Sequence, residues 1–244
     1  MISICIPVYN MQNRGIEFLK QALDSLQTQT CRDFEVVISD DSEDNLIEEF
    51  IKDAAYVMDV RYVKNLSGKK GSSDNLNNAV RQARYEIIKP IFQDDWIVNN
   101  CMIENIIDSG SAWGALGYKN SNNETTYVPK WNNRMLLGIN TIGAPTGIWF
   151  KKTDDLFFDE NLSWLMDCEF YYRLYTVYGK PFILNGLYYV SRIWDGAVSY
   201  TINRKVVHKK ELSYLRQKYK QPLTLFLWRF YSLTSKYKRK LSFS

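Results

Sequence analysis

The chain has 244 residues, 45% hydrophobic and 24% charged, an ordinary composition for one globular domain or one domain with an appendage. Its net charge of +4 is unevenly spread, because residues 204–240 carry many lysines and arginines but a single acid, Glu211, and the remainder is net acidic. This asymmetry argues against a nucleic-acid-binding protein that uses its whole surface. We therefore expect no nucleic-acid partner and a local role for the basic segment.

The four cysteines form no C-x-x-C pair, so we expect reduced, mostly buried thiols in a cytoplasmic protein (Cys5, Cys31, Cys101 and Cys168). The first residues, "MISICIPVYN", resemble a strand rather than a basic leader, so we expect no targeting segment. No run of 18 apolar residues occurs, so we expect no membrane-spanning helix.

Strand-like and helix-like segments alternate through the first half of the chain. Apolar runs predict buried strands at 2–8, 34–41, 60–64 and 86–92. Apolar residues at spacings of three and four predict helices at 16–26, 46–54 and 71–84. Because strands that alternate with helices are joined by crossovers, this order predicts a mainly parallel sheet with ligands at the carboxyl ends of its strands.

Two pairs of adjacent acids end predicted strands, Asp40-Asp41 and Asp94-Asp95. Like charges side by side are costly to ionise, so one interpretation is a pair of solvated turns. The other is a divalent cation, because hard cations prefer carboxylate oxygens. Four carboxylates on one edge of a sheet favour the cation.

From about residue 111 the pattern changes to strand-like and loop-like pieces, followed by a helix at 166–179 and an apolar segment at 180–193. We find no internal repeat and no low-complexity linker. The change therefore indicates two halves of one domain.

Six motifs occur in an order that resembles the family 2 glycosyltransferases of the GT-A fold. They are "ISICIPVYN", "FEVVISDDSED", "GSSDNLNNAVRQA", "FQDDW", "GAPTGIWFKK" and "LMDCEFYYRL", and they extend over residues 1–195. The resemblance implies an α/β GT-A fold, with a Rossmann-like, mainly parallel sheet flanked by helices and a C-terminal helical extension. It divides the chain into a catalytic domain (1–203) and a basic helical tail (204–244). Within the domain, 1–110 would be the nucleotide-binding half and 111–203 the acceptor-side half.

The segment "QDDW" resembles the DXD-type motif of this family. By that match Asp95 would be the ligand of Mn²⁺ or Mg²⁺, and Asp94 would reach the ribose or a metal-bound water. Gln93 stands where many members have another acid. The other residues that the resemblance implies for the nucleotide site are Pro7, Tyr9, Asp40, Asp41, Lys70 and Asn75, with Asp41 favoured for the edge of the uracil base.

"MDCEF" resembles the segment that carries the general base of inverting members. Asp167 would take the proton of the acceptor hydroxyl, and Met166 replaces the usual Glu. Asp167 could instead cap the helix that begins there. Glu169 should point elsewhere on the helix.

One position departs from the family pattern. Many members carry a His two residues after the residue that is Arg192 here, whereas this chain has Trp194 followed by Asp195. Either Asp195 completes the metal site, or the ion is held by Asp95, the diphosphate and water alone. His208 lies on a basic helix and is predicted to be a surface residue.

The tail contains a basic amphipathic pattern over residues 223–241. Such a helix can lie on an anionic membrane surface, or it can pack against the domain or a second subunit in a homodimer. We expect a cytoplasmic protein that could contact the inner face of a membrane through 221–244.

The resemblance implies an inverting, metal-dependent transfer from a UDP-sugar to a hydroxyl of a glycan or lipid-linked acceptor. The alternative is a nucleotide- or carbohydrate-binding protein with the same fold that has lost turnover. A phosphoacceptor receiver domain fits less well, because its acid pair follows the first strand.

Overall fold

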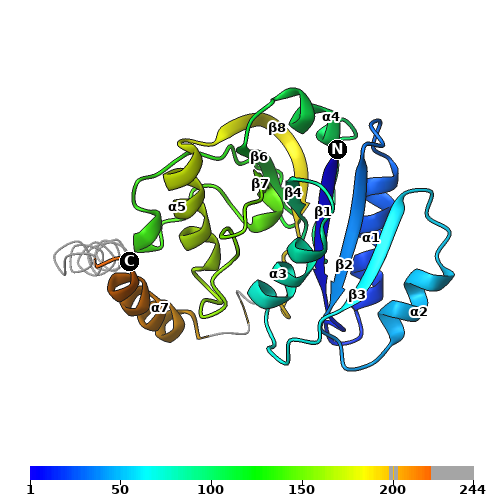
Figure 1. Cartoon of the computed structure of the whole chain (residues 1–244), viewed down its shortest axis with the longest axis horizontal. Helices are drawn as coiled ribbons and strands as arrows, with labels where there is room; N and C mark the ends of the chain where they lie inside the picture. The colour runs from blue at the N-terminus through cyan, green and yellow to red at the C-terminus, as the bar shows by residue number, and fades with distance from the viewer. Residues whose placement is uncertain (198–199, 201–202, 221–244) are drawn as a thin grey trace, which may run out of the picture.

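The computed structural model describes residues 1–197, 200 and 203–220 (Figure 1). The first half of the chain contains β1 (Ile2–Val8), α1 (Gly15–Gln27), β2 (Phe34–Asp40), α2 (Leu46–Asp53), β3 (Asp59–Lys64), α3 (Ser72–Gln82), β4 (Ile87–Pro90), β5 (Trp96–Ile97) and α4 (Met102–Asp108). The second contains β6 (Trp113–Asn120), the 3-10 turns η1 (Met135–Leu137) and η2 (Pro145–Gly147), β7 (Ile148–Lys151), α5 (Met166–Tyr178), β8 (Phe182–Ser191) and α7 (Arg204–Lys218).

The described strands form one sheet in the order β3-β2-β1-β4-β7-β6-β8-β5. The four strands β3, β2, β1 and β4 are parallel, as the sequence predicts. Beyond them the sheet is mixed, because β7 runs antiparallel to both β4 and β6, whereas β6 and β8 are parallel. The predicted α/β fold is confirmed, and its parallel part lies within the predicted nucleotide-binding half, residues 1–110.

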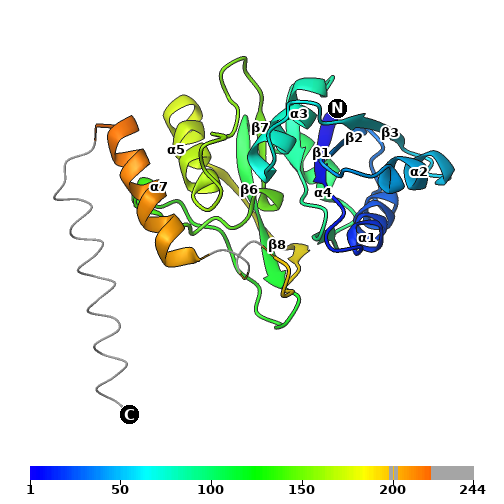
Figure 2. The ribbon, with the colours of Figure 1, turned by 90° about the horizontal axis from the view of Figure 1, so that it is seen from below.

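Helices cover both faces of the sheet (Figures 1 and 2). Side chains alternate along a strand, so Cys5 of β1 joins a core with α3, α5 and α7, whereas Ile4 and Ile6 join a core with α1, α2 and α4. Figure 2 shows α3 and α1 on opposite sides of β1. β1 and β2 are therefore buried on both faces along their whole length.

The fourth strand is shorter than predicted. β4 ends at Pro90, where the proline lacks a ladder donor and the amide of Ile91 donates to the carbonyl of Cys5 instead (3.0 Å). The chain then turns, with the amide of Asp95 donating to the carbonyl of Phe92 (2.9 Å). The second acid pair consequently lies in a turn between β4 and β5 rather than on a strand end.

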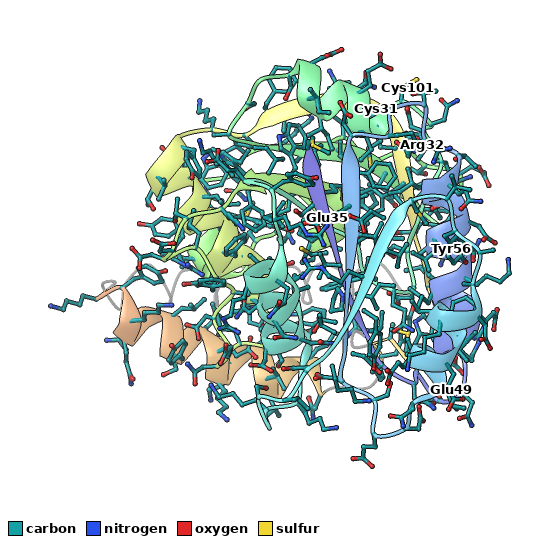
Figure 3. The ribbon with its side chains drawn as sticks, turned by 45° about the vertical axis from the view of Figure 1, so that its right-hand side comes forward. Cys31, Arg32, Glu35, Glu49, Tyr56 and Cys101 are labelled. Atoms are coloured by element: carbon teal, nitrogen blue, oxygen red, sulfur yellow. The ribbon has the colours of Figure 1, made fainter. Side chains whose placement is uncertain are left out.

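The cysteines carry free thiols: Cys5 and Cys168 are buried, whereas Cys31 and Cys101 are half-buried on one side of the molecule (Figure 3). No helix within the described residues combines the length and apolarity needed to cross a membrane. The amphipathic helix predicted at 223–241 lies outside the described residues.

The helix α7, which begins the basic segment, packs against α5 and the loop before it. The buried carboxylate of Glu211 accepts hydrogen bonds from the amides of Ser163 (2.8 Å), Trp164 (3.1 Å) and Leu165 (2.7 Å). Lys218 forms an ion pair of 2.6 Å with the fully buried Glu169 of α5. The predicted boundary at 203/204 stays a prediction, but α7 shares the core of the domain.

We expect Glu211→Ala to lower the free energy of unfolding by about 2–4 kcal/mol, because three amides lose their acceptor in a buried place. Urea unfolding followed by circular dichroism measures this change. The control is Lys210→Ala on the exposed side of the same helix, which should change stability by less than about 0.5 kcal/mol. Equal stability of the two variants would show that the hydrogen bonds of Glu211 contribute little to the fold.

Candidate active site

A cleft of about 880 Å³ opens where β1 and β2 end and the turn after β4 begins. It lies at the carboxyl edge of the parallel strands, where α/β sheets bind ligands. All of the predicted site residues except Asp40 line it: Pro7, Tyr9, Asp41, Lys70, Asn75, Asp94, Asp95 and Asp167. Residues from distant parts of the chain thus meet in one cavity.

Asp95, the predicted metal ligand, is only 3% exposed and is held on both oxygens. The Thr146 hydroxyl donates to Oδ2 (2.5 Å) and the Arg192 amide donates to Oδ1 (3.0 Å). Burial, with the neighbouring Asp94 carboxylate, raises the pKa of Asp95 to about 7 in spite of these bonds. The hydrogen bonds from the described residues therefore do not offset the cost of burying this charge.

Asp94 accepts a hydrogen bond from Trp194, which stands where many members of the family that the sequence resembles have His. Trp194 Nε1 donates to Asp94 Oδ2 (2.9 Å), and the indole packs edge-on against Phe18 with ring centroids 5.2 Å apart. Arg192 Nε donates to the Asp94 carbonyl (2.9 Å). Asp195 is exposed and does not line the cleft.

A fully buried lysine, which sequence reasoning missed, lies behind the acid pair. Lys89 Nζ donates to the carbonyls of Pro90 (2.7 Å) and Thr146. Burial lowers the pKa of Lys89 to about 7, and the charge of Asp95 opposes this shift. Lys89 thereby holds the segment whose Thr146 hydroxyl binds Asp95. A lysine inside an apolar run was the only sequence signal for it.

The acid pair fits a divalent cation. No group of three or more His, Cys, Asp or Glu that could hold a metal occurs in the part of the chain that the structure describes. However, Mg²⁺ and ions like it are commonly held by one or two carboxylates, with phosphates and water as the other ligands. Asp95 and Asp94 supply two adjacent carboxylates, and the raised pKa of each, due mainly to burial, is the condition that a cation would relieve.

The two residues of the first acid pair differ in position: Asp40 is buried in the structure, whereas Asp41 lines the cleft. Asp40 is fully buried away from the cleft and accepts from the Tyr62 hydroxyl (2.8 Å) and Lys64 Nζ (3.2 Å). Asp41 lines the cleft, where Asn65 Nδ2 donates to its Oδ1 (2.7 Å) and the Gly71 amide approaches Oδ2 (3.3 Å). Only Asp41 is placed to meet a ligand.

The remaining residues of the predicted nucleotide site lie around Asp41 and Gln93. Gln93 is fully buried and accepts from the Tyr9 amide (2.9 Å), so it braces the end of β1. Asn75 Nδ2 donates to the Val8 carbonyl (2.9 Å). Lys70 Nζ donates to the Asp41 carbonyl (3.0 Å).

Asp167 lies in the first turn of α5 but does not cap it, because the N-cap residue is Leu165. The amide of Cys168 donates to its Oδ1 (2.6 Å), and Asn140 Nδ2 donates to its Oδ2 (2.5 Å). The amide of Gly143 donates in turn to Asn140 Oδ1 (3.0 Å), which fixes that side chain. Burial raises the pKa of Asp167 to about 6.

A second cavity of about 760 Å³, lined by residues between 118 and 168, adjoins the cleft. The two cavities share Ala144, Trp164 and Asp167. Neither Asp94 nor Asp95 lines the second cavity. Asp167 therefore lies between two cavities, and the acid pair belongs to one of them.

Residues 3–173 match the family model described as "Glycosyl transferase family 2". The chain belongs to glycosyl transferase family 2. The match contains the acid pair, Asp167 and every residue that lines the cleft except those in 191–197. The resemblance seen in the six motifs is thereby confirmed.

Two named proteins are similar to part of this chain in sequence. One is GalNAc(5)-diNAcBac-PP-undecaprenol beta-1,3-glucosyltransferase of Campylobacter jejuni, 26% identical over 102 residues, which are 41% of this chain and 32% of that protein. The other is the uncharacterized glycosyltransferase EpsJ of Bacillus subtilis, 27% identical over 135 residues, 53% of this chain and 37% of that protein. The matched regions span about a third of each relative's length.

Solved structures share the fold. S. aureus TarS in complex with UDP-GlcNAc has a TM-score of 0.65 at 21% identity, with 82% of this chain and 61% of that chain covered. A mannosyltransferase from Pyrobaculum calidifontis in complex with GDP-Man and Mn²⁺ has a TM-score of 0.60 at 16% identity, with 86% and 63% covered. At these identities the likeness establishes the GT-A fold of this family 2 chain.

We expect Asn140→Leu to raise the pH at which Asp167 titrates above the value of about 6 in the parent, because the amide stabilises the charged carboxylate. Carboxyl ¹³C NMR of aspartate-labelled protein measures this titration. The matched control is Asn122→Leu, at an exposed asparagine outside both cavities. An unchanged Asp167 titration in Asn140→Leu would rule out the stabilising role of this hydrogen bond.

Proposed function

We propose that this family 2 protein is an inverting glycosyltransferase that moves a sugar from a UDP-sugar to a hydroxyl group with the help of Mn²⁺ or Mg²⁺. One observation carries the proposal: the acid pair and Asp167 line the same cleft, and only Asp167 also faces a second cavity. A donor held at the acid pair and an acceptor in the second cavity would thus approach Asp167 from different sides.

On the donor side, Asp95 would hold the cation, and Asp94 would face the ribose or a metal-bound water. When bound, such an ion neutralises the charge that develops on the leaving diphosphate. Thr146 and the Arg192 amide keep Asp95 fixed, so little rearrangement is needed when the donor binds. Lys70 would add positive charge at the rim.

The uracil base is assigned to Asp41, whose carboxylate can accept the N–H of the base. Two cleft groups support a nucleoside there: Asn75 Oδ1 and Ser42 Oγ are buried and have no hydrogen-bond partner among the described residues. Buried polar atoms are seldom left unpaired, so ribose or base groups are suitable partners. Pro7 and Tyr9 would complete the wall of this part of the cleft.

On the acceptor side, Asp167 is the proposed general base. As the acceptor oxygen forms its bond to the anomeric carbon, the bond to the diphosphate oxygen breaks and the hydroxyl proton passes to Asp167. A pKa near 6 leaves the carboxylate ionised at pH 7 and still basic enough to accept a proton. A single displacement of this kind inverts the configuration at the anomeric carbon.

The alternative is a binding protein of the same fold without turnover. It is favoured by Trp194, whose indole occupies one oxygen of Asp94. Hydrolysis of UDP-sugars in the presence of Mn²⁺ distinguishes the two functions. A glycan or lipid-linked acceptor, a homodimer, a cytoplasmic location and membrane contact through 221–244 stay predictions.

Calorimetry of UDP binding with and without Mn²⁺ tests the metal ligand. The parent should bind UDP at least about tenfold more tightly with Mn²⁺, a difference of about 1.4 kcal/mol. Asp95→Ala should lose this difference, because the cation loses its principal carboxylate. Asp195→Ala is the matched control and should keep it, since Asp195 does not line the cleft. If only Asp195→Ala lost the effect of Mn²⁺ on UDP affinity, the metal ligand would be Asp195 and not Asp95.

Steady-state kinetics of UDP-sugar turnover test the base. Asp167→Asn should lower kcat by about 10²-fold or more, because an amide cannot accept the proton in the transition state. The affinity for UDP should change little, since the nucleotide is assigned to the other end of the cleft. The exposed Asp154→Asn is the control for a general loss of charge. A kcat of Asp167→Asn near that of the parent would remove Asp167 from the mechanism.

A further inference from the structure

The second cavity has an aromatic wall that the donor side does not explain. Tyr118, Tyr127 and Trp164 line it together with the polar side chains of Asn140 and Thr141. Trp164 also lines the cleft, so this wall reaches the boundary at which Asp167 lies. The lining of the cavity thus combines aromatic rings with polar side chains.

Three tyrosines form a stacked column, and two of them, Tyr118 and Tyr127, line the cavity. The Tyr127 ring stacks on Tyr118 with centroids 5.3 Å apart and planes at 27°, and Tyr118 stacks on Tyr189 at 5.2 Å and 21°. Tyr189 is fully buried, whereas Tyr127 is 39% exposed. The column therefore leads from the core to an aromatic ring at the surface of the cavity.

Tyr127 is fixed by its backbone as well as by its ring. Its amide donates to the Tyr118 carbonyl (2.6 Å), and the Tyr118 amide donates to the Tyr127 carbonyl (3.0 Å). These two bonds form an isolated bridge to β6. An exposed ring held in this way loses little conformational freedom when a ligand binds, which favours affinity.

The polar side chains of the cavity can form hydrogen bonds with the hydroxyl groups of a ligand. Asn140 is anchored by the Ile142 and Gly143 amides and donates to Asp167, so the carboxylate is directed by a cavity residue. Among the described residues, the charged side chains that line the cavity are Lys130 and Asp167, one of each sign. This balance suits an uncharged polyhydroxyl ligand better than a phosphate, for which several cations would be expected.

We propose that the second cavity binds a neutral sugar ring of the acceptor, with the apolar face of the ring on Tyr127 and one hydroxyl directed to Asp167. This proposal rests on the proposed function, since it gives the chemical class of the acceptor. The acceptor oxygen forms the new bond to the anomeric carbon, its proton passes to Asp167, and the UDP diphosphate leaves. Tyr127 is a binding residue and takes no part in proton transfer.

Saturation-transfer NMR tests the proposal with methyl glycosides of glucose, galactose, mannose, N-acetylglucosamine and N-acetylgalactosamine, in the presence of UDP and Mn²⁺. At least one glycoside should receive saturation from the parent. Tyr127→Ala should bind it about tenfold or more weakly, in line with the loss of an aromatic stacking face. Tyr127→Phe should retain binding, because the ring face is kept.

The control is Tyr56→Ala, at a tyrosine on the side of the molecule opposite α5 and α7 (Figure 3), which should bind the glycoside like the parent. Calorimetry of UDP binding distinguishes a failure of the proposed function from a failure of the sugar site alone. If the parent binds no UDP, the proposed function fails. If UDP binds but no glycoside does, or if Tyr127→Ala and Tyr56→Ala bind it equally, the sugar site is overturned and the proposed donor site stands.

Discussion

The fixed position of the Asp95 carboxylate is the constraint on which the site depends. Its two oxygens are held by a hydroxyl from η2 and an amide just beyond β8, so three separate segments meet at one side chain. Lys89 of β4 adds a third hydrogen bond to this group by donating to the Thr146 carbonyl. Since hydrogen bonds to a buried charge are strong, this group of contacts joins the parallel half of the sheet to the mixed half.

Burial also makes the charged acid pair costly for the stability of the fold, which indicates a role in ligand binding. Glu35 on β2 provides the contrast (Figure 3): it is fully buried, but Ser3 Oγ and the Arg84 amide donate to it and Arg61 pairs with it at 3.4 Å. Among the described residues, Asp94 and Asp95 have no comparable set of positive partners, and burial raises the pKa of both. A protein retains such costly groups where a ligand compensates for them, which is the physical reason for assigning a cation to this turn.

The parallel half of the fold and the cleft were predictable, because buried strands and amphipathic helices have distinct periods and strand ends meet at one edge. The second half was less so, since β6, β7 and β8 pair across long separations that no local pattern encodes. For the same reason the sequence pointed to Asp95 and Asp167 as candidates but missed Thr146, which binds the Asp95 carboxylate, and Asn140, which binds the Asp167 carboxylate. The pairing of Asp40 with Tyr62 likewise needs the register of β2 and β3.

Two cavities that meet at Asp167 are the basis of the proposed mechanism, in which the acceptor attacks from the side opposite the diphosphate. The most direct measurement is ¹H NMR of the sugar that the protein first releases when it hydrolyses an α-linked UDP-sugar, recorded before the anomers equilibrate. The account predicts that the β-anomer appears first, because a single displacement inverts the anomeric carbon. Release of the α-anomer first would mean retention and would contradict the assignment of Asp167 as the base of a direct displacement.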